Sequence, residues 1–538
     1  MPTLDWIGKK AVVNHHLRVP YRLLKDVPSL SCGDPGTGNL IVQGDNLLAL
    51  KALLPFYAGQ VKCIYIDPPY NTGNEGWAYN DNVKSPTIQK WLGEVVGKEG
   101  ETLDRHDRWL CMMYPRLALL REFLREDGAI FISIDDTEVS ALRMVMDLIY
   151  GNQNFLASIV WQKRYSPSND HKTICPIHDY VLAYQKSPLW QRNLLPRTEE
   201  NDEQYKYSDE NGIFRASDYT CNKTSAERPN LYYPIIHPIT GIEIWPKKTR
   251  VWSFSKEAHE GNTKNNLVFW GRNGKAKVPS YKRYRDQLRG GGGTVPGTWW
   301  THEFAGHNDS ARKELREIGL TADFSTPKPT LLVECILQIA TNPGDLVLDS
   351  FAGSGTTGHA ILKFNAAKPD ESPRRFIMVE MEPEIARNIT SERVRRVSAG
   401  YSNQKGGAVP GLGGGFRFCE LGGELFDELG QIRDAVAFGE LARHVWFTEF
   451  HEPLPRERVP NSPFLGTCNG VGLYLLYNGI LGDKSTNGGN VLNRAILERL
   501  PPYDGPKIIY CAGNLLGPDR LRASSITVRQ TPYEIKVS

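Results

Sequence analysis

Residues 345–365 carry three elements in a fixed order: a short apolar strand, a glycine-rich turn and a helix. The strand is Asp345-Leu-Val-Leu-Asp349, the turn contains Gly353 and Gly355, and the helix covers about 356–365. Glycines let the backbone approach a ligand closely, and the start of a helix offers free N–H groups to a carboxylate or a phosphate. This order is typical of a doubly wound α/β sheet. A tight strand-to-helix connection that binds nothing is the alternative.

Glu380, at the end of the next apolar run, restricts the class of ligand that is expected. Arg375-Phe-Ile-Met-Val-Glu380 predicts a strand, and an acid at its end can accept hydrogen bonds from both hydroxyls of a ribose. No Gly-Lys-Ser/Thr follows the glycine-rich turn, so the turn is not a phosphate-cradling P-loop. The pattern therefore indicates a cofactor that contains a nucleoside.

A second α/β stretch lies earlier in the chain. The apolar runs 61–66 and 129–134 predict buried strands, and apolar residues spaced three or four apart predict an amphipathic helix over 109–126. A further helix is expected over about 137–149. Residues 163–325, in contrast, are polar and rich in turns. We therefore expect one α/β sheet that is split by a long insertion.

The chain length fits several domains, because 538 residues at about 150 residues per domain correspond to three or four. A glycine-rich run over 405–415 is a candidate linker, and a second run over 289–297 predicts a flexible loop. We predict a doubly wound (Rossmann-like) α/β fold followed by a C-terminal α+β domain. The expected boundaries are 1–165 and 326–400 for the two parts of the split sheet, 166–325 for the insertion and 401–538 for the C-terminal domain.

Composition disfavours several protein classes. No run of about 18 apolar residues exists, so no membrane span is expected, and the first residues lack the basic-then-apolar layout of a secretory signal. The nine cysteines are scattered singly without a CxxC pair, which disfavours a zinc ribbon or a disulfide scaffold and favours a reducing cytoplasm. The sequence shows no ligand cluster for a metal. The net charge of +3 says little about partners.

Asp67-Pro68-Pro69-Tyr70 follows the first buried strand, at the end where open α/β sheets place their sites. Two consecutive prolines fix the backbone and remove two N–H donors, which leaves the Asp67 carboxylate and the Pro68 carbonyl as rigid acceptors. An exocyclic amine has two N–H donors that match these acceptors, and Tyr70 offers a flat face on which a planar base can stack. A turn that merely ends the strand is the alternative for the tetrapeptide alone.

Taken together, Asp67-Pro-Pro-Tyr70 and Phe351-Ala-Gly-Ser-Gly-Thr-Thr357 resemble the motifs of the S-adenosylmethionine-dependent DNA amino-methyltransferases. Their order along the chain is similar to that of the permuted β group of this family. Residues 109–161 resemble bacterial adenine methyltransferases, notably the modification subunits of type III restriction systems. The resemblance implies a cytoplasmic enzyme that transfers a methyl group from S-adenosylmethionine to adenine N6 in double-stranded DNA, as part of a restriction-modification or related defence system.

The resemblance also implies roles for single residues. Asp67, Pro68, Pro69 and Tyr70 would hold the target base, and in this family an Asp at the first position goes mostly with adenine N6, whereas a Ser goes mostly with cytosine N4. Transfer would be direct, without a metal, to a base flipped out of the duplex. The residues expected near the cofactor are Asp45, Lys328, Asp349, Phe351, Gly353, Gly355, Thr356 and Glu380, with the turn amides at its methionine carboxylate and Glu380 at its ribose.

The insertion carries a basic stretch with interleaved aromatic residues. Residues 270–290 hold seven basic side chains against one acid, together with Tyr281 and Tyr284. Such a stretch fits contacts to phosphates and bases, so 166–325 is predicted to be the target-recognition region. A solvated basic face is the alternative. The residues expected to contact DNA are Arg272, Lys282, Arg283 and Arg285.

The C-terminal part, 401–538, carries no catalytic constellation; helices are expected near 424–443 and over 490–500. Its layout resembles the same part of type III modification subunits, which implies a homodimer interface or a docking surface for a restriction (nuclease–helicase) subunit. Other functions stay open for the whole chain: a cytosine-N4 methyltransferase, the same chemistry on RNA or a protein amide, and a DNA-binding specificity subunit with a vestigial methyltransferase site.

Overall fold

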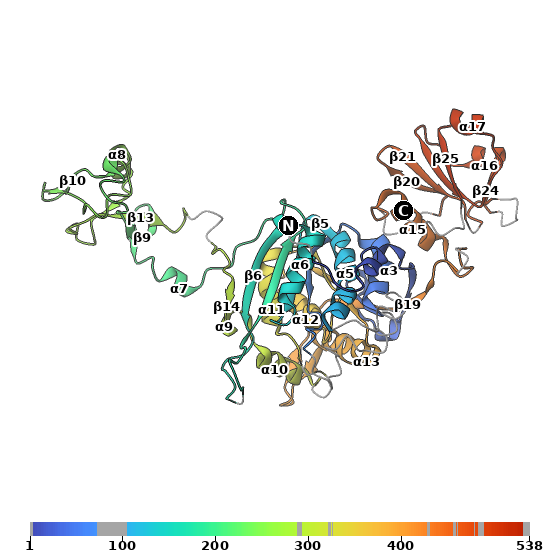
Figure 1. The fold of residues 1–538 in the computed structure, drawn as a ribbon, viewed down its shortest axis with the longest axis horizontal. Coiled ribbons are helices and arrows are strands. Elements are labelled where there is room, and N and C mark those ends of the chain that lie inside the picture. The colour runs from blue at the N-terminus through green and yellow to red at the C-terminus, as the bar shows by residue number, and fades with distance from the viewer. Residues whose placement is uncertain are drawn as a thin grey trace. The chain divides into compact units, whose positions relative to one another are not determined.

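The computed structural model describes residues 4–72, 105–169, 171–287, 293–320, 324, 326–427, 431–455, 459, 461–477, 479–482 and 489–530. The chain divides into two compact units (Figure 1). Unit 1 comprises Met1–Asn193 and Gly297–Ser538, and unit 2 comprises Leu194–Pro296. Unit 2 is narrower than the insertion expected over 166–325. Part of the loop expected at 289–297 lies outside the described residues.

Unit 1 is built around an eleven-stranded sheet (Figure 1). Its five central strands are parallel and apolar, as expected for a sheet with helices on both faces. In spatial order they are β3 (Leu40–Gln43), β16 (Arg375–Glu380), β15 (Leu346–Asp349), β4 (Val61–Ile66) and β5 (Leu124–Ile134). Beyond β5 lie β7 (His178–Gln185), β6 (Phe155–Gln162) and β14 (Trp299–Trp300); beyond β3 lie β19 (Gly415–Glu424), β1 (Arg22–Asp26) and β2 (Cys32–Gly33).

Two groups of helices cover this sheet (Figure 1). One group is α3 (Asn46–Tyr57), α5 (Arg105–Phe123) and α6 (Val139–Tyr150), which contact one another. The other is α11 (Thr330–Ala340), α12 (Thr356–Ala366) and α14 (Ser391–Ala399). The arrangement confirms the predicted doubly wound α/β fold.

The structure differs from the expected linker at 405–415. This run contributes β18 (Ala408–Pro410), which pairs with β17 (Gly400–Ser402), and the chain then adds β19 to the large sheet. A Cβ atom at Gly415 would lie 2.5 Å from the Cys32 carbonyl oxygen, so this glycine permits a close approach of two strands rather than flexibility. Because β19 extends to residue 424, the following helix α15 covers Phe438–Phe450 and not 424–443.

The C-terminal end of unit 1 forms a second sheet of β20 (Phe464–Cys468), β21 (Val471–Leu475), β23 (Lys507–Cys511) and β25 (Ile526–Gln530). The last three strands are parallel, with α16 (Arg494–Arg499) and α17 (Pro518–Ala523) in the crossovers between them. Parallel neighbours need such crossovers. This part is therefore more parallel than the predicted α+β arrangement implies.

Unit 2 has a small core of its own, centred on the buried residues Tyr219, Ile235 and Trp252. An antiparallel sheet contains β12 (Val268–Phe269), β13 (Ser280–Tyr284), β9 (Gly212–Asp218) and β8 (Tyr207–Asp209). A hairpin of β10 (Ile235–Ile236) and β11 (Glu243–Ile244) and the helix α8 (Lys256–Lys264) complete the unit. Among all described residues, no helix has the length and apolar character needed to cross a membrane.

Candidate active site

The two sequence motifs meet because their strands are neighbours. β4 and β15 pair in parallel, so their carboxyl ends lie at the same edge of the sheet. Asp67 follows β4 directly, and Asp349 ends β15. A cavity of about 210 Å³ opens at this edge, and both motifs line it. The lining residues that the sequence predicted are Asp67, Pro68, Pro69, Tyr70, Lys328, Asp349, Phe351, Gly353 and Thr356.

The tetrapeptide is fixed from behind by residues that the sequence did not single out. The indole N–H of the buried Trp109 donates to the Pro69 carbonyl at 2.7 Å. Asn71 has a left-handed backbone, with φ 60°, and is fully buried. Its side-chain amide donates to Glu138 Oε1 at 2.5 Å and to the Arg105 carbonyl at 3.1 Å. These bonds hold the Asp-Pro-Pro-Tyr run against α5, which positions its polar groups toward the cavity.

Asp67 is the centre of a small charged cluster. Lys328 Nζ lies 2.6 Å from both carboxylate oxygens of Asp67, and the Tyr70 hydroxyl donates to Asp67 Oδ1 at 3.0 Å. The Lys328 ammonium also lies 4.8 Å from the centre of the Tyr70 ring. The sequence placed Lys328 near the cofactor; its contacts in the structure are to the tetrapeptide. The Lys328 ammonium therefore already donates hydrogen bonds to the Asp67 carboxylate.

The glycine-rich turn is tight because two of its residues have positive φ: 49° at Gly353 and 76° at Gly355. A Cβ at Gly355 would lie 2.9 Å from the Thr390 carbonyl oxygen, so only glycine fits there. Asp349 closes the turn by accepting from the Phe351 amide at 3.0 Å and from the Thr357 hydroxyl at 2.5 Å. Burial raises the pKa of Asp349 to about 7, although these hydrogen bonds oppose the rise.

Glu380 braces the same turn and is fully buried. Its Oε2 accepts from the Gly353 amide at 2.8 Å, and its Oε1 accepts from the Glu382 amide at 3.0 Å. Glu380 and Gly355 are not among the residues that line the cavity. The Glu380 carboxylate thus lies behind the turn and is separated from the cavity by Gly353, which lines it.

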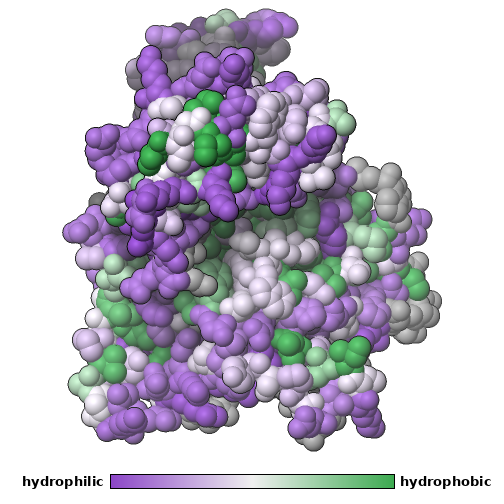
Figure 2. Space-filling view, turned by 90° about the vertical axis from the view of Figure 1, so that its left-hand side faces the viewer, coloured by the Kyte–Doolittle hydropathy of each residue, from purple (hydrophilic) through white to green (hydrophobic). Residues whose placement is uncertain are grey.

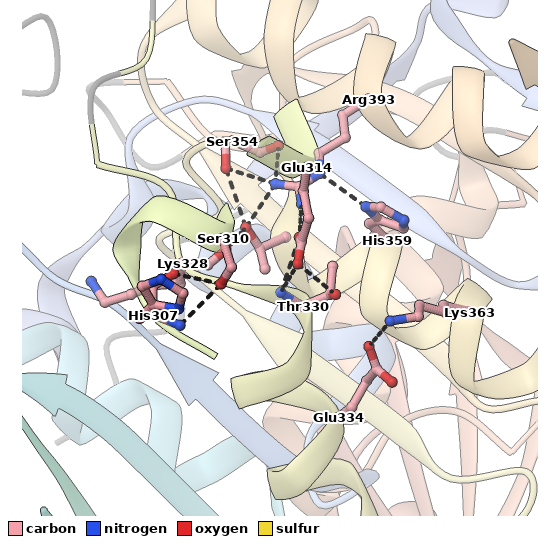
Figure 3. A network of polar contacts seen from close by, with 11 residues as sticks. His307, Ser310, Glu314, Lys328, Thr330, Glu334, Ser354, His359, Lys363 and Arg393 are labelled. Atoms are coloured by element: carbon pink, nitrogen blue, oxygen red, sulfur yellow. Dashed lines mark hydrogen bonds and ion pairs between the residues drawn. The ribbon is translucent and has the colours of Figure 1, made fainter. Parts of the chain in front are cut away.

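A buried network links the turn to two helices (Figure 3). Arg393 on α14 is fully buried and donates to Ser354 Oγ at 3.0 Å and to Thr356 Oγ1 at 2.8 Å. Its other Nη lies 3.2 Å from Glu314 Oε2, on α10 (Asn308–Ile318). Burial and the adjacent Arg393 guanidinium hold the pKa of His359 well below its usual value, so the neutral ring accepts the Arg393 Nε–H at 3.2 Å.

The same network reaches the loop before α11. Glu314 accepts from the Thr330 amide at 3.2 Å and from the Thr330 hydroxyl at 3.1 Å, and Thr356 Oγ1 donates to the Lys328 carbonyl at 3.0 Å. The Arg393–Glu314 ion pair therefore braces both the glycine-rich turn and the loop that carries Lys328. No local pattern predicts this ion pair, because Glu314 and Arg393 are 79 residues apart.

Asp45 lies outside the cavity lining and has a different task. Its Oδ1 accepts from the amides of Leu47 and Leu48 at 2.9 and 3.2 Å, which caps the start of α3. Its Oδ2 pairs with Arg116 Nη2 at 2.8 Å. Such a cap stabilises a helix by about 1 kcal/mol. The geometry accounts for Asp45 as a helix cap and an ion-pair partner.

Residues 61–391 of the chain match a protein family described as DNA methylase. The chain belongs to the DNA methylase family. It is 32% identical over 387 residues to the type III restriction-modification enzyme StyLTI Mod subunit of Salmonella typhimurium, covering 67% of this chain and 57% of that protein. It is 30% identical over 441 residues to the EcoPI Mod subunit of Escherichia phage P1, covering 71% and 64%. It is also 30% identical over 369 residues to the type II methyltransferase M.KpnI of Klebsiella pneumoniae, covering 65% and 82%. The matches thus span about three fifths of the two Mod subunits.

Further charged residues line the methylase cavity. They include Asp135, Lys163, Arg164, Asp179 and Arg312. Lys163 Nζ lies 2.5 Å from Asp179 Oδ1. Burial raises the pKa of Asp179 to about 6, and the neighbouring Lys163 and Lys328 oppose that rise. No set of three or more His, Cys, Asp or Glu side chains in the described part of the chain is arranged to hold a metal ion.

The four residues expected to contact DNA lie in unit 2 of the methylase and have unequal exposure. On β13, Lys282 is 6% exposed and its Nζ pairs with Asp209 at 2.7 Å, whereas Arg283 on the opposite face is exposed. Arg285 pairs with Asp202 at 3.0 Å and keeps 44% of its side chain exposed. Arg272 is exposed and lies over the Tyr207 ring. Side chains alternate along a strand, so a run of cations on β13 cannot all face solvent, and Lys282 is a buried ion-pair partner instead.

Proposed function

We propose that this chain is a site-specific DNA methyltransferase that transfers a methyl group from S-adenosylmethionine to adenine N6 in double-stranded DNA. The observation that carries the proposal is that Asp67-Pro-Pro-Tyr70 and the glycine-rich turn line one cavity. One motif offers acceptors and a flat ring to an amino-bearing base. The other offers backbone amides and a buried acid to a nucleoside-containing cofactor.

The residues around the turn fit such a cofactor. Gly353 has a positive φ, which disfavours any other residue, and a Cβ there would lie only 3.1 Å from the Phe324 ring. Glu380 lies behind this turn and accepts from its Gly353 amide, and we carry over its expected role at the ribose hydroxyls as part of the proposal. The amides at the start of α12 suit the methionine carboxylate. When bound, S-adenosylmethionine supplies a methyl group on a positively charged sulfur.

The tetrapeptide would hold the base. The N6 lone pair of adenine is delocalised into its ring, and two hydrogen bonds accepted by the Asp67 carboxylate and the Pro68 carbonyl would orient that nitrogen toward the methyl donor. Tyr70 would stack on the flipped base. Lys328 bonds both oxygens of Asp67, and because a carboxylate offers about four lone-pair sites, the amino group can be accepted beside the lysine. Adenine is favoured over cytosine because the first motif residue is Asp.

The names of two relatives support a biological setting for this chemistry, which we propose for this chain as well. Both relatives are named as Mod subunits of type III restriction-modification enzymes. We infer that the chain modifies DNA in a restriction-modification system, that unit 2 reads the target sequence, and that residues 401–538 serve a homodimer or a restriction subunit. Such an enzyme would work in the cytoplasm, where its nine free cysteines stay reduced.

The test is an Asp67→Ala variant. Removing the carboxylate deletes the acceptor for the amino group but leaves the glycine-rich turn, so methyl transfer should fall by about 100-fold or more while cofactor affinity stays near that of the wild type. Transfer is measured with tritiated S-adenosylmethionine and unmethylated bacterial genomic DNA, and cofactor affinity by calorimetry. Asp309→Ala, which removes an exposed carboxylate of α10, is the matched control. Near-normal transfer by Asp67→Ala would reject the assignment.

A further inference from the structure

Two turns of unit 2 expose large apolar residues. They are residues 236–248 around the β10–β11 hairpin and residues 271–278 between β12 and β13, and together we call them the tip. Ile236, Ile239, Ile242 and Trp245 are 57, 63, 63 and 50% exposed. Figure 2 views the molecule from the side on which Figure 1 draws β10, and it shows hydrophobic residues gathered among hydrophilic ones on that face. Clustered exposed apolar side chains of this kind mark interaction sites.

The exposed isoleucines are held outward by a rigid turn. His237 is 5% exposed, and its Nδ1 accepts from the amides of Ile239 and Thr240 at 3.2 and 3.3 Å. The His237 amide donates to the Ile242 carbonyl at 3.0 Å, and the imidazole packs 4.6 Å from the Trp270 ring. The buried histidine thus fixes both ends of the turn. Ile239 and Ile242 are therefore exposed on a turn that its own hydrogen bonds hold, although exposing apolar side chains to water is unfavourable.

The second turn brings cations to the same place. A Cβ at Gly274 would lie 2.7 Å from Ile239 Cδ1, so the two turns are in contact at this glycine. The exposed residues of the tip include five cations, Lys247, Lys248, Arg272, Lys275 and Lys277, and a single acid, Glu243. The tip therefore combines exposed apolar side chains with an excess of positive charge, a composition that suits a groove of duplex DNA and its phosphates.

We propose that the tip of unit 2 enters a groove of duplex DNA, with Ile239 and Ile242 against the bases and Lys275 and Lys277 on the flanking phosphates. The proposal rests on the function proposed above and assigns its DNA contact to a surface other than β13. Apolar side chains in a groove contact thymine methyl groups or wedge between base steps, and lysines contribute affinity that depends on salt. A protein partner is disfavoured, because five exposed cations against a single acid suit a polyanion.

The experiment uses the full chain and a fluorescein-labelled duplex of mixed sequence, with binding followed by anisotropy over a range of salt concentrations. Lys275→Glu/Lys277→Glu should weaken binding and reduce the slope of log affinity against log salt by about 2, because each phosphate contact contributes about 0.9. Ile239→Ser/Ile242→Ser should weaken binding about ten-fold without changing the slope. Ile239→Leu/Ile242→Leu should restore it, because it returns aliphatic bulk to the same positions.

Ile213→Ser is the matched control. Ile213 is 45% exposed in unit 2, but it lies on β9 beside Arg285, at the opposite end of the sheet from Ser280 and the second turn. This variant should bind DNA as the wild type does. Thermal melting and calorimetry with S-adenosylmethionine verify that every variant is folded and retains an intact cofactor site.

Wild-type DNA affinity and salt slope in both double variants would overturn the proposal, and so would a serine variant that loses self-association in sedimentation but not DNA binding. The function proposed for the cavity fails separately. If the wild type bound duplex through the tip yet incorporated no methyl group into genomic DNA, the tip assignment would stand and the methyltransferase assignment would fall.

Discussion

At the scale of single residues, Asp349 has the most informative environment. The side chain is 2% exposed, and burial raises its pKa to about 7 from an ordinary value near 4. The native state therefore binds a proton that the unfolded state has released between about pH 4 and pH 7, and stability must fall as pH rises through that window. Asp349→Asn keeps the shape and the neutral charge. We expect its melting temperature, relative to that of the wild type, to rise between about pH 4 and pH 7 and to level off above that range.

The measurement is differential scanning calorimetry of both proteins from pH 5 to pH 8, with Asp309→Asn as an exposed carboxylate control. A constant difference between Asp349→Asn and wild type across the range would contradict the pKa. Residue by residue, the sequence identified groups whose chemistry is local, such as Asp67 and Gly353. The sequence did not reveal that Asp45 caps a helix and pairs with Arg116, or that Lys282 is buried against Asp209. Both ion pairs join residues that lie about 70 positions apart in the chain.

At the scale of elements, the pair Arg393–Glu314 ties α14 and α10 to the glycine-rich turn. Arg393→Met should lower cofactor affinity by ten- to hundred-fold, about 1.4 to 2.8 kcal/mol, because Ser354 and Thr356 lose their donor and the turn loosens. Glu314→Gln should cost less, since a Gln oxygen still accepts from Thr330. In the double variant the losses should not add, because both substitutions break one network.

Calorimetric titration with S-adenosylmethionine measures these affinities, and methyl transfer at saturating cofactor separates positioning from general damage. Arg395→Met provides the control, since Arg395 lies on the same helix, pairs with Glu392 and is 53% exposed in its side chain. If Arg393→Met bound cofactor as tightly as Arg395→Met, the network would have no role in shaping the turn. Equal loss in every variant would point to unfolding instead.

Element prediction succeeded where one local pattern dominates. The strands β4, β15 and β16 and the helix α12 lie within a residue or two of their expected positions, because apolar runs and glycine turns mark them directly. β19 was missed because its glycines read as a linker. Gly415 is needed because of a tertiary contact: it packs against the Cys32 backbone. The two residues lie far apart in the chain, so no local pattern predicts this contact.

At the scale of the whole molecule, the insertion is a separable unit. Leu195 and Thr294 form a two-way bridge, with N–H to O distances of 2.9 Å in both directions, so the chain enters and leaves unit 2 side by side. The expected boundaries of 166–325 were broader than the observed Leu194–Pro296, because β7 and β14 look like irregular insertion in sequence yet pair with strands of the large sheet.

This geometry makes excision of unit 2 a decisive test of its role. Replacing residues 194–296 with a short Gly-Ser linker removes the unit at the place where the Leu195–Thr294 bridge brings its entering and leaving segments together. Unit 1 keeps its own core and cavity, so the shortened protein should bind S-adenosylmethionine within about three-fold of the wild type. It should lose at least about 100-fold in affinity for duplex DNA, together with most of the salt dependence, because the cations of the tip are gone. Anisotropy gives the DNA affinity and calorimetry gives the cofactor affinity of the same preparation.

Retained DNA affinity would move target recognition to unit 1, whereas lost cofactor binding would make unit 2 a structural part of the catalytic fold.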